Sequence, residues 1–366
     1  MPPLWGRPPG VTKALQDCDV RDGGGVWIAP DLSTSRGCLL TDISLSEPAD
    51  LAVRSDTARR AGAGDTRFRL MTMAAAILVL LIFLGVIAAL IDGAMPAFKA
   101  YGFGFLTEER WRPSRDIFGA VGPIYGTLIT SAIAMLIALP VGIGIAIFLT
   151  ELCPRMLRRP IGIAIELLAG IPSIIYGIWG LFVFAPFFQT YVQEPVILAL
   201  DGVPVLGTLF VGAPYGIGIF TAGLILSIMI LPFIAAVTRD VLETVPSVLK
   251  EAAYGLGSTQ WEVMRKVALP YSRIGVVGGA MLALGRALGE TMAVTFVIGN
   301  AHRIEPSLFA PGTSISASIA NEFTEATSEL YVASLVELGL LLFVITFIVL
   351  ACAQLMLRSM EKGQGK

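Results

Sequence analysis

The 366-residue sequence has few charged residues and almost none of the residues that build catalytic or metal centres. Only 15% of its residues are charged, the formal net charge is -2, and there is a single histidine. A chain without a basic field lacks what nucleic-acid binding requires, so that class of function is excluded. One histidine and scattered carboxylates also fail to supply the clustered acid, base or nucleophile of an enzyme.

Two further absences concern cysteine and nucleotide. The four cysteines, at positions 18, 38, 153 and 352, show no spacing typical of a metal site or a disulfide framework, and we predict unpaired thiols. The sequence contains no GxxxxGK[ST] loop. We therefore expect the chain to bind no nucleotide, metal or other cofactor of its own.

The sequence is rich in long apolar segments. Apolar residues make up 55% of the chain, and a helix of about 20 apolar residues crosses the hydrocarbon of a bilayer. The sequence therefore predicts an all-α polytopic membrane protein with six transmembrane helices. We expect them at about 70–91, 123–149, 161–188, 215–237, 274–299 and 331–357. Pro172 interrupts the third of these spans, and Pro232 lies in the fourth.

Lysine and arginine near the spans set the expected orientation. They are concentrated in the loops that share a side with both termini, and they are sparse in the opposite loops. We therefore predict that both termini and the 238–273 loop are cytoplasmic. Residues 1–66 contain Pro-Pro pairs and a triple glycine without apolar periodicity, so we expect a disordered cytoplasmic tail there.

The polar segment 246–270 separates the fourth and fifth spans and must protrude from the bilayer. Pro246 suits a helix start, and the residues after it are good helix formers. Gly257 is suited to the left-handed conformation that ends a helix, and Thr259 with Glu262 has the spacing of a capping box that starts the next one. The pattern predicts a helical hairpin with its elbow at Gly257. The alternatives are a partner-binding element and an ordinary solvated hairpin.

Arg286 and Glu290 are the most informative ionisable residues within the predicted spans. They stand four residues apart in the fifth span, which on a continuous helix places them on one face, where they can pair. Charged residues inside spans are expensive and usually face the bundle interior or water. In one interpretation Arg286 lines an anion path and Glu290 weakens its grip. In the other, the two form a structural ion pair.

Other polar residues are weaker candidates. We expect Glu166 to have a structural role near the cytoplasmic end of the third span, and we assign no function to Glu337 in the sixth. Hydroxyls in spans usually bond the carbonyl four residues earlier, and this applies to Thr130, Ser131, Ser173, Thr291 and Thr295. We expect His302 to be a solvated loop residue. We also expect the charged run 107–116, which includes Trp111, to be a solvated outer loop.

The hairpin resembles the EAA loop of permease subunits of ABC importers, with Glu251, Ala252, Ala253 and Gly257 at the motif positions and Val267 in place of the usual Ile. The strings that extend the likeness are LGRALGETMAVTFVIGN (284–300), ELLAGIPSIIYGIWGLFVFAP (166–186) and PIYGTLITSAIA (123–134). With them the chain resembles the PstC-type permeases of phosphate importers from about residue 68 to about residue 358.

This resemblance implies a type I importer permease fold. It divides the chain into a tail (1–66), a first span with an outer loop (67–122) and a transmembrane domain (123–357). It also implies a PstA-like second permease, two ATPase subunits and a periplasmic phosphate-binding protein. Glu251, Ala252, Ala253 and Gly257 are then expected in the element that docks on an ATPase. Arg286 and Glu290 match a pair that the family carries, which favours a substrate path.

Several alternatives stay open at this point. A permease for another oxyanion, such as sulfate or molybdate, has the same architecture, because the binding protein makes much of the selection. A secondary transporter also has charged residues and broken helices within its spans, but it usually shows two similar halves, and no convincing internal repeat is present. A membrane-embedded enzyme lacks support for the reasons given above.

Overall fold

We describe the chain from a computed structural model, which covers residues 48–364 except 201, 204–205 and 211. The chain divides into two compact units, Met1–Leu78 and Val79–Lys366. In the first unit, the described residues belong to α1 (Pro48–Tyr101). Residues 48–66, part of the tail predicted to be disordered, belong to this helix, and they include several helix-forming Ala and Arg residues behind an initial proline. Residues 1–47, where the same prediction applies, lie outside the described part.

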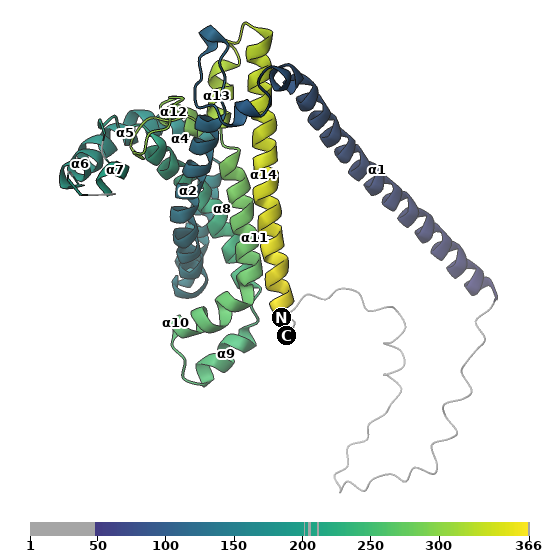
Figure 1. Cartoon of the computed structure of the whole chain (residues 1–366). Helices are drawn as coiled ribbons and strands as arrows, with labels where there is room; N and C mark the ends of the chain where they lie inside the picture. The colour runs from purple at the N-terminus through teal and green to yellow at the C-terminus, as the bar shows by residue number, and fades with distance from the viewer. Residues whose placement is uncertain (1–47, 201, 204–205, 211, 365–366) are drawn as a thin grey trace, which may run out of the picture. The chain divides into compact units, whose positions relative to one another are not determined.

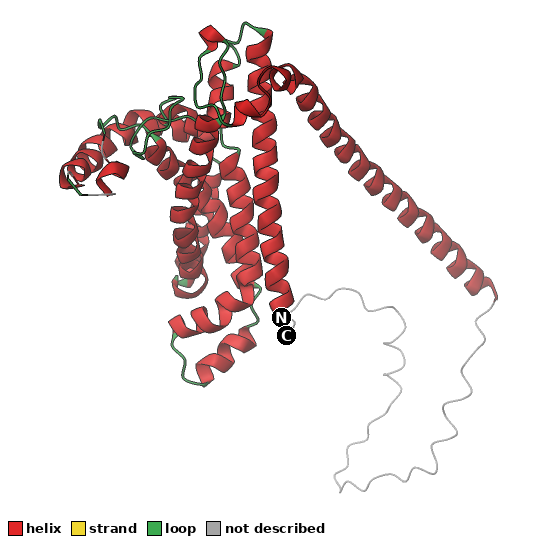
Figure 2. Ribbon diagram, in the orientation of Figure 1, coloured by secondary structure: helices red, strands yellow, loops and turns green. Residues whose placement is uncertain are grey.

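The second unit is helical in the part that the structure describes, with two isolated bridges and no β-strand. Figures 1 and 2 show its helices. The α-helices that follow α1 are α2 (Val121–Ile147), α3 (Arg155–Ala169), α4 (Ser173–Trp179), α5 (Ala185–Phe188), α6 (Glu194–Leu200), α7 (Leu206–Phe210), α8 (Ile219–Glu243), α9 (Ser247–Gly255), α10 (Gln260–Val263), α11 (Leu269–Leu288), α12 (Met292–Val297), α13 (Ile315–Glu322) and α14 (Glu329–Gln364).

Short 3-10 and π-helical turns join several of these elements. The 3-10 turns are η1 (Gly102–Leu106) and η2 (Pro113–Arg115), and the π turns are η3 (Phe148–Leu152), η4 (Gly180–Phe184), η5 (Gln189–Gln193) and η6 (Met264–Ala268). Because the π turns continue the neighbouring α-helices, α10, η6 and α11 form one helical run from the hairpin into a membrane span.

Helices α2 and α8 make the central packing of the second unit. Small residues let them approach closely: a Cβ added at Gly142 would lie 2.7 Å from Ile234, and one at Gly223 would lie 2.7 Å from Ile133. Around them, α4, α11 and α12 contribute to one apolar core that includes fully buried Ile225 and Ile230. Helix α14 packs alongside α11 (Figure 1).

Among the described residues, six helices are long and apolar enough to cross a membrane, as predicted. They are Thr66–Leu106, Val121–Leu152, Ser173–Leu200, Ile219–Glu243, Gln260–Leu288 and Glu329–Ser359. Two predicted spans are wrong in detail. The third begins only after Pro172, because the chain breaks there and leaves α3 as a separate helix. The fifth ends at Leu288, and α12 is a separate short helix.

Candidate functional site

The segment 246–270 folds as the predicted hairpin, which lies beyond the start of α11 (Figure 1). Gly257 has φ +85°, so it is the left-handed residue that turns the chain after α9. The predicted capping box is present: Thr259 Oγ1 accepts from the Glu262 amide, and Glu262 Oε2 accepts from the Thr259 amide at 3.0 Å. The hairpin shape therefore follows from local sequence.

The hairpin exposes the residues predicted to meet a partner. Glu251 and Ala252 are exposed on α9, Ala253 is half-buried, and Glu251 forms no ion pair with the residues that the structure describes. Large apolar side chains are also exposed beside them, with Leu256 at 89% and Trp261 at 62%. Exposed apolar side chains next to an unpaired carboxylate are typical of a protein-binding surface.

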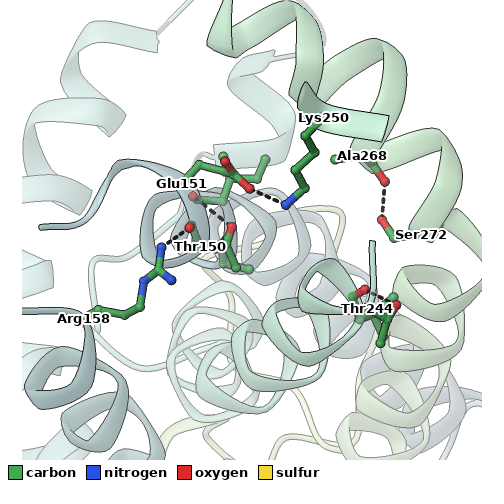
Figure 3. A network of polar contacts seen from close by, with 10 residues as sticks. Thr150, Glu151, Arg158, Thr244, Lys250, Ala268 and Ser272 are labelled. Atoms are coloured by element: carbon green, nitrogen blue, oxygen red, sulfur yellow. Dashed lines mark hydrogen bonds and ion pairs between the residues drawn. The ribbon is translucent and has the colours of Figure 1, made fainter. Parts of the chain in front are cut away.

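The base of the hairpin is tied to the end of α2 by an ion pair that sequence reasoning missed. Lys250 Nζ lies 2.6 Å from Glu151 Oε1, and both side chains are largely buried (Figure 3). Burial, followed by the negative charge of Glu151, raises the pKa of the nearby Tyr254 phenol above its ordinary value. The available signal was Glu151, an acidic residue just past the end of the second predicted span. No sequence pattern around Glu151 indicates that it meets Lys250.

An apolar cluster lies under the same end of the hairpin. The buried residues are Ala146 from α2, Leu242 from α8, Val245 from the turn after α8, and Met264 and Ala268 from η6. Ser272 Oγ donates to the Ala268 carbonyl at 2.7 Å and so satisfies a backbone group where the helix is irregular (Figure 3). Since protein interiors are close-packed, a displacement of the hairpin should also displace the adjoining parts of α2, α8 and α11.

Arg286 and Glu290 do not share a helical face, and that prediction is wrong. Helix α11 ends at Leu288, and the chain passes through Gly289 and Glu290 before α12 begins at Met292. Glu290 Oε1 accepts from the Ala293 amide at 3.4 Å, at the start of α12. Arg286 is exposed and has no ion pair within the described part of the chain. Gly289 explains the break, because glycine favours helix ends over helix interiors.

This geometry leaves an uncommitted guanidinium in the last turn of a membrane helix. A planar guanidinium binds phosphate or carboxylate oxygens in a bidentate manner. Because Glu290 is half-buried and engaged with a backbone amide, it does not neutralise Arg286 within this chain. Arg286 is thus available to an anion or to a carboxylate on a partner subunit.

The hydroxyl candidates mostly behave as predicted. Thr130 donates to Gly126 O, Ser131 to Thr127 O and Thr295 to Thr291 O, each at 2.7 Å and each four residues back. Thr291 instead donates to Gly289 O at 3.4 Å, and Ser173 is the first residue of α4. The hydroxyls that bond their own helix use their donors there, so they add little to an anion site.

Glu166 and Glu337 have different environments. Glu166 on α3 forms an ion pair with Arg239 on α8 at 2.8 Å, which agrees with the predicted structural role. Glu337 is 6% exposed and lines an apolar cavity of about 360 Å³ with residues that include Phe98 and Leu341. Its Oε2 atom has no hydrogen-bond partner among the described residues.

The predictions of solvated loop residues at Trp111 and His302 are wrong. Trp111 is 9% exposed, and its ring stacks on His302 at 4.9 Å between centroids. Glu322 accepts hydrogen bonds from Trp111 Nε1 at 2.6 Å and Tyr331 at 2.7 Å, and its other oxygen lies 2.6 Å from His302 Nε2. These four residues form the Trp111 cluster, in which Trp111 meets a residue 211 positions later in the sequence. Burial alone would raise the pKa of Glu322, but these hydrogen bonds and His302 outweigh it and lower that pKa.

No group of three or more metal-binding side chains occurs within the described residues. The two cysteines in that part of the chain, buried Cys153 and exposed Cys352, are free thiols, as predicted. Cys18 and Cys38 lie outside it.

Comparisons with known proteins agree with this architecture. The family model described as "Binding-protein-dependent transport system inner membrane component" matches residues 138–362. A Mesorhizobium japonicum protein named "Phosphate transport system permease protein PstC" is 64% identical over 318 residues, which are 87% of this chain and 97% of that protein. A Pasteurella multocida protein of the same name is 58% identical over 299 residues, 82% of this chain and 93% of that protein.

A solved structure supports the fold alone. The bacterial alginate ABC transporter, in complex with an alginate pentasaccharide-bound periplasmic protein, aligns with a TM-score of 0.55 at 18% identity, covering 81% of this chain and 96% of that one. The predicted all-α membrane fold with six spans is therefore that of an importer permease. The family match, the identity to curated relatives and the shared fold together place this chain in the family of binding-protein-dependent transport inner-membrane components, the permease subunits of ABC importers, which are transport components and not enzymes.

Proposed function

We propose that this chain is the permease subunit through which an ATP-driven importer moves inorganic phosphate across the bacterial cytoplasmic membrane. The observation that carries the proposal is the 64% identity to a protein named as a phosphate transport permease, over 97% of that protein's length. Identity at this level across the spans and the hairpin supports a common substrate as well as a common fold.

The partners in this proposal are a homologous PstA-like permease, two nucleotide-binding ATPase subunits and a periplasmic phosphate-binding protein. The exposed hairpin face around Glu251, Ala252, Ala253 and Gly257 docks on an ATPase subunit. The continuous run from α10 through η6 to α11 then carries motion from the ATPase to Arg286, one membrane crossing away. The hairpin and both termini are cytoplasmic, which the distribution of lysine and arginine supports.

In the same proposal, Arg286 lies on the phosphate path at the interface with the second permease. Its unpaired guanidinium compensates the cost of removing an anion from water. Glu290 shapes the adjacent break between α11 and α12 through its bond to the Ala293 amide. The chain binds no cofactor, and ATP hydrolysis belongs to the partner subunits.

Transport assays with the reconstituted complex test this function. Proteoliposomes that contain this chain, its partner permease and the ATPases are supplied with binding protein, internal ATP and labelled phosphate. We expect uptake that requires ATP and the binding protein and that excess sulfate or molybdate leaves unchanged. Preferential uptake of sulfate or molybdate would assign the chain to another oxyanion, and uptake driven by an ion gradient without ATP would identify a secondary transporter.

A further inference from the structure

A basic cavity lies where α3 packs on the end of α8. Its volume is about 250 Å³, and its lining includes Arg155, Arg158 and Arg159 of α3, Arg239 of α8, and the carboxylates of Glu166 and Glu243. With four guanidinium groups and two carboxylates, the lining carries an excess of positive charge. This cavity is distinct from the hairpin face and from Arg286.

The sequence of α3 builds the cavity. Positions 155, 159, 162 and 166 follow the spacing that places residues on one face of a helix. Gly162 is buried on this face, and a Cβ added there would lie 3.1 Å from Arg239 Nη1, so the glycine makes room for the arginine of α8. A small residue between basic ones therefore opens a hollow lined by guanidinium groups.

Two of the four arginines are already engaged. Arg239 pairs with Glu166 at 2.8 Å and with Asp240 at 3.0 Å. Arg158 donates to the Thr150 carbonyl in η3 (Figure 3). Arg155 and Arg159 are exposed and form no ion pair with any residue that the structure describes. They are the groups that remain free to bind an anion.

The remaining surface of α3 is suited to lipid. Met156 is 88% exposed, Leu157 52% and Leu167 68%, which gives the helix an apolar side away from the arginines. The helix also lies between two membrane spans, one ending at Leu152 and the next beginning at Ser173. An amphipathic helix with arginines on its polar side and exposed apolar residues beside them is typical of an element at the membrane interface.

We propose that this cavity binds the phosphoryl headgroup of an anionic phospholipid. Arg155 and Arg159 hold the phosphate oxygens, for which the planar guanidinium is suited, and the acyl chains lie on the apolar side of α3. Arg158, between them in sequence, contacts the same η3 turn that Glu151 uses to hold Lys250 of the hairpin (Figure 3). A lipid bound here therefore lies next to the segment that anchors the hairpin. The proposal does not depend on which anion is transported.

Native mass spectrometry of the purified membrane complex tests this site. The complex, in detergent, is titrated with phosphatidylglycerol and separately with phosphatidylcholine. We expect preferential retention of phosphatidylglycerol and about 30-fold weaker binding in the double variant Arg155→Ala/Arg159→Ala, since each arginine near an anionic lipid contributes about 1 kcal/mol. The matched control is Arg358→Ala, an exposed arginine near the end of α14 outside the cavity, and it should bind phosphatidylglycerol like the wild type.

Three results would overturn the proposal. These are equal retention of the two lipids, unchanged binding in the double variant, and displacement of phosphatidylglycerol by inorganic phosphate, which would make the cavity a free-phosphate site. If the double variant does not fold, the single variants Arg155→Ala and Arg159→Ala provide the comparison, with about fivefold weaker binding expected for each.

Discussion

Lys250 and Glu151 form a 2.6 Å ion pair that joins the hairpin to the end of the second membrane span, although 99 residues separate them in sequence. Both side chains are shielded from solvent, at 18% and 16% exposure. Lys250 immediately precedes the exposed Glu251 in α9. Lys250 therefore contacts the rest of the subunit, whereas Glu251 faces its surroundings. This ion pair couples the position of α9 to that of the end of the second membrane span, which includes α2.

Breaking the pair should loosen the hairpin. Lys250→Met leaves the Glu151 carboxylate shielded and unpaired, which costs about 1–3 kcal/mol. A double-mutant cycle with Glu151→Gln, measured by denaturation of the purified complex, should give a coupling energy in that range. The exposed pair Lys266–Glu262, at 3.1 Å, is the matched control and should give a much smaller coupling energy, because water screens ion pairs at the surface. Equal coupling energies in the two cycles would argue against an anchoring role for Lys250.

The elbow of the hairpin should tolerate substitution at one glycine and not at its neighbour. Gly257→Ala places a side chain at φ +85°, which costs about 1–2 kcal/mol. Gly255 is the last residue of α9 and an added Cβ would meet open space there, so Gly255→Ala should be neutral or stabilising. Thermal unfolding of the two variants checks this. A Gly257→Ala variant as stable as Gly255→Ala would mean that the turn adopts another conformation.

Reversing the charge on the exposed face of α9 should disconnect the permease from its ATPase. Glu251→Lys removes the carboxylate proposed to meet the ATPase groove, while the residue has no ion pair within the described chain to lose. We expect an intact permease that no longer stimulates ATP hydrolysis in proteoliposomes. The control is Glu325→Lys, an exposed carboxylate between α13 and α14 and outside the hairpin, which should keep normal ATPase stimulation. Normal ATPase stimulation by Glu251→Lys would remove the hairpin from its proposed role.

Arg286→Ala should abolish phosphate uptake while the complex still assembles. Within this chain the guanidinium is exposed and unpaired, so its removal breaks no structural ion pair among the described residues. Glu290→Gln should be milder, because an amide oxygen can still accept from the Ala293 amide. Labelled-phosphate uptake, together with recovery of the assembled complex, distinguishes transport from folding. Wild-type uptake by Arg286→Ala would refute the substrate-path role.

The Trp111 cluster should make stability depend on acid pH. The lowered pKa of Glu322 means that its carboxylate stabilises the fold fully above about pH 4.3, the value for an unperturbed glutamate, and that this contribution is lost as pH falls through the lowered pKa. Unfolding temperatures measured from about pH 3 to pH 7 should therefore show an acid-side decline that Glu322→Gln reduces. Glu325→Gln, an exposed neighbour, is the control and should keep the wild-type slope. Identical slopes in all three proteins would exclude Glu322 as the source.

Features that depend on neighbouring residues were predictable. The hairpin elbow at Gly257 and the capping box of Thr259 and Glu262 rest on backbone preferences that act over three or four residues. The hydroxyl of Ser131 bonds its own helix for the same reason. The prediction that Arg286 and Glu290 share a helical face was wrong although it is also local, because Gly289 follows the end of α11 at Leu288, well before the predicted end of the span at 299.

Other features depend on residues that only the folded chain brings together. Trp111 and Glu322 are 211 residues apart, and no pattern in either segment indicates that they meet. The same holds for Lys250 with Glu151, and for Arg239, which enters the hollow at Gly162.

The sequence by itself determined the membrane setting, the six spans, the hairpin and the family, because hydropathy, turn chemistry and motif spacing are written along the chain. Only the tertiary structure decided which charges are paired, which are free and which loops are buried. The physical reason is that an ion pair or a stacked ring depends on distance in space, and this is set by the packing of helices from distant parts of the sequence. Lys250 looks like any other lysine in a polar loop until α2 places Glu151 beside it.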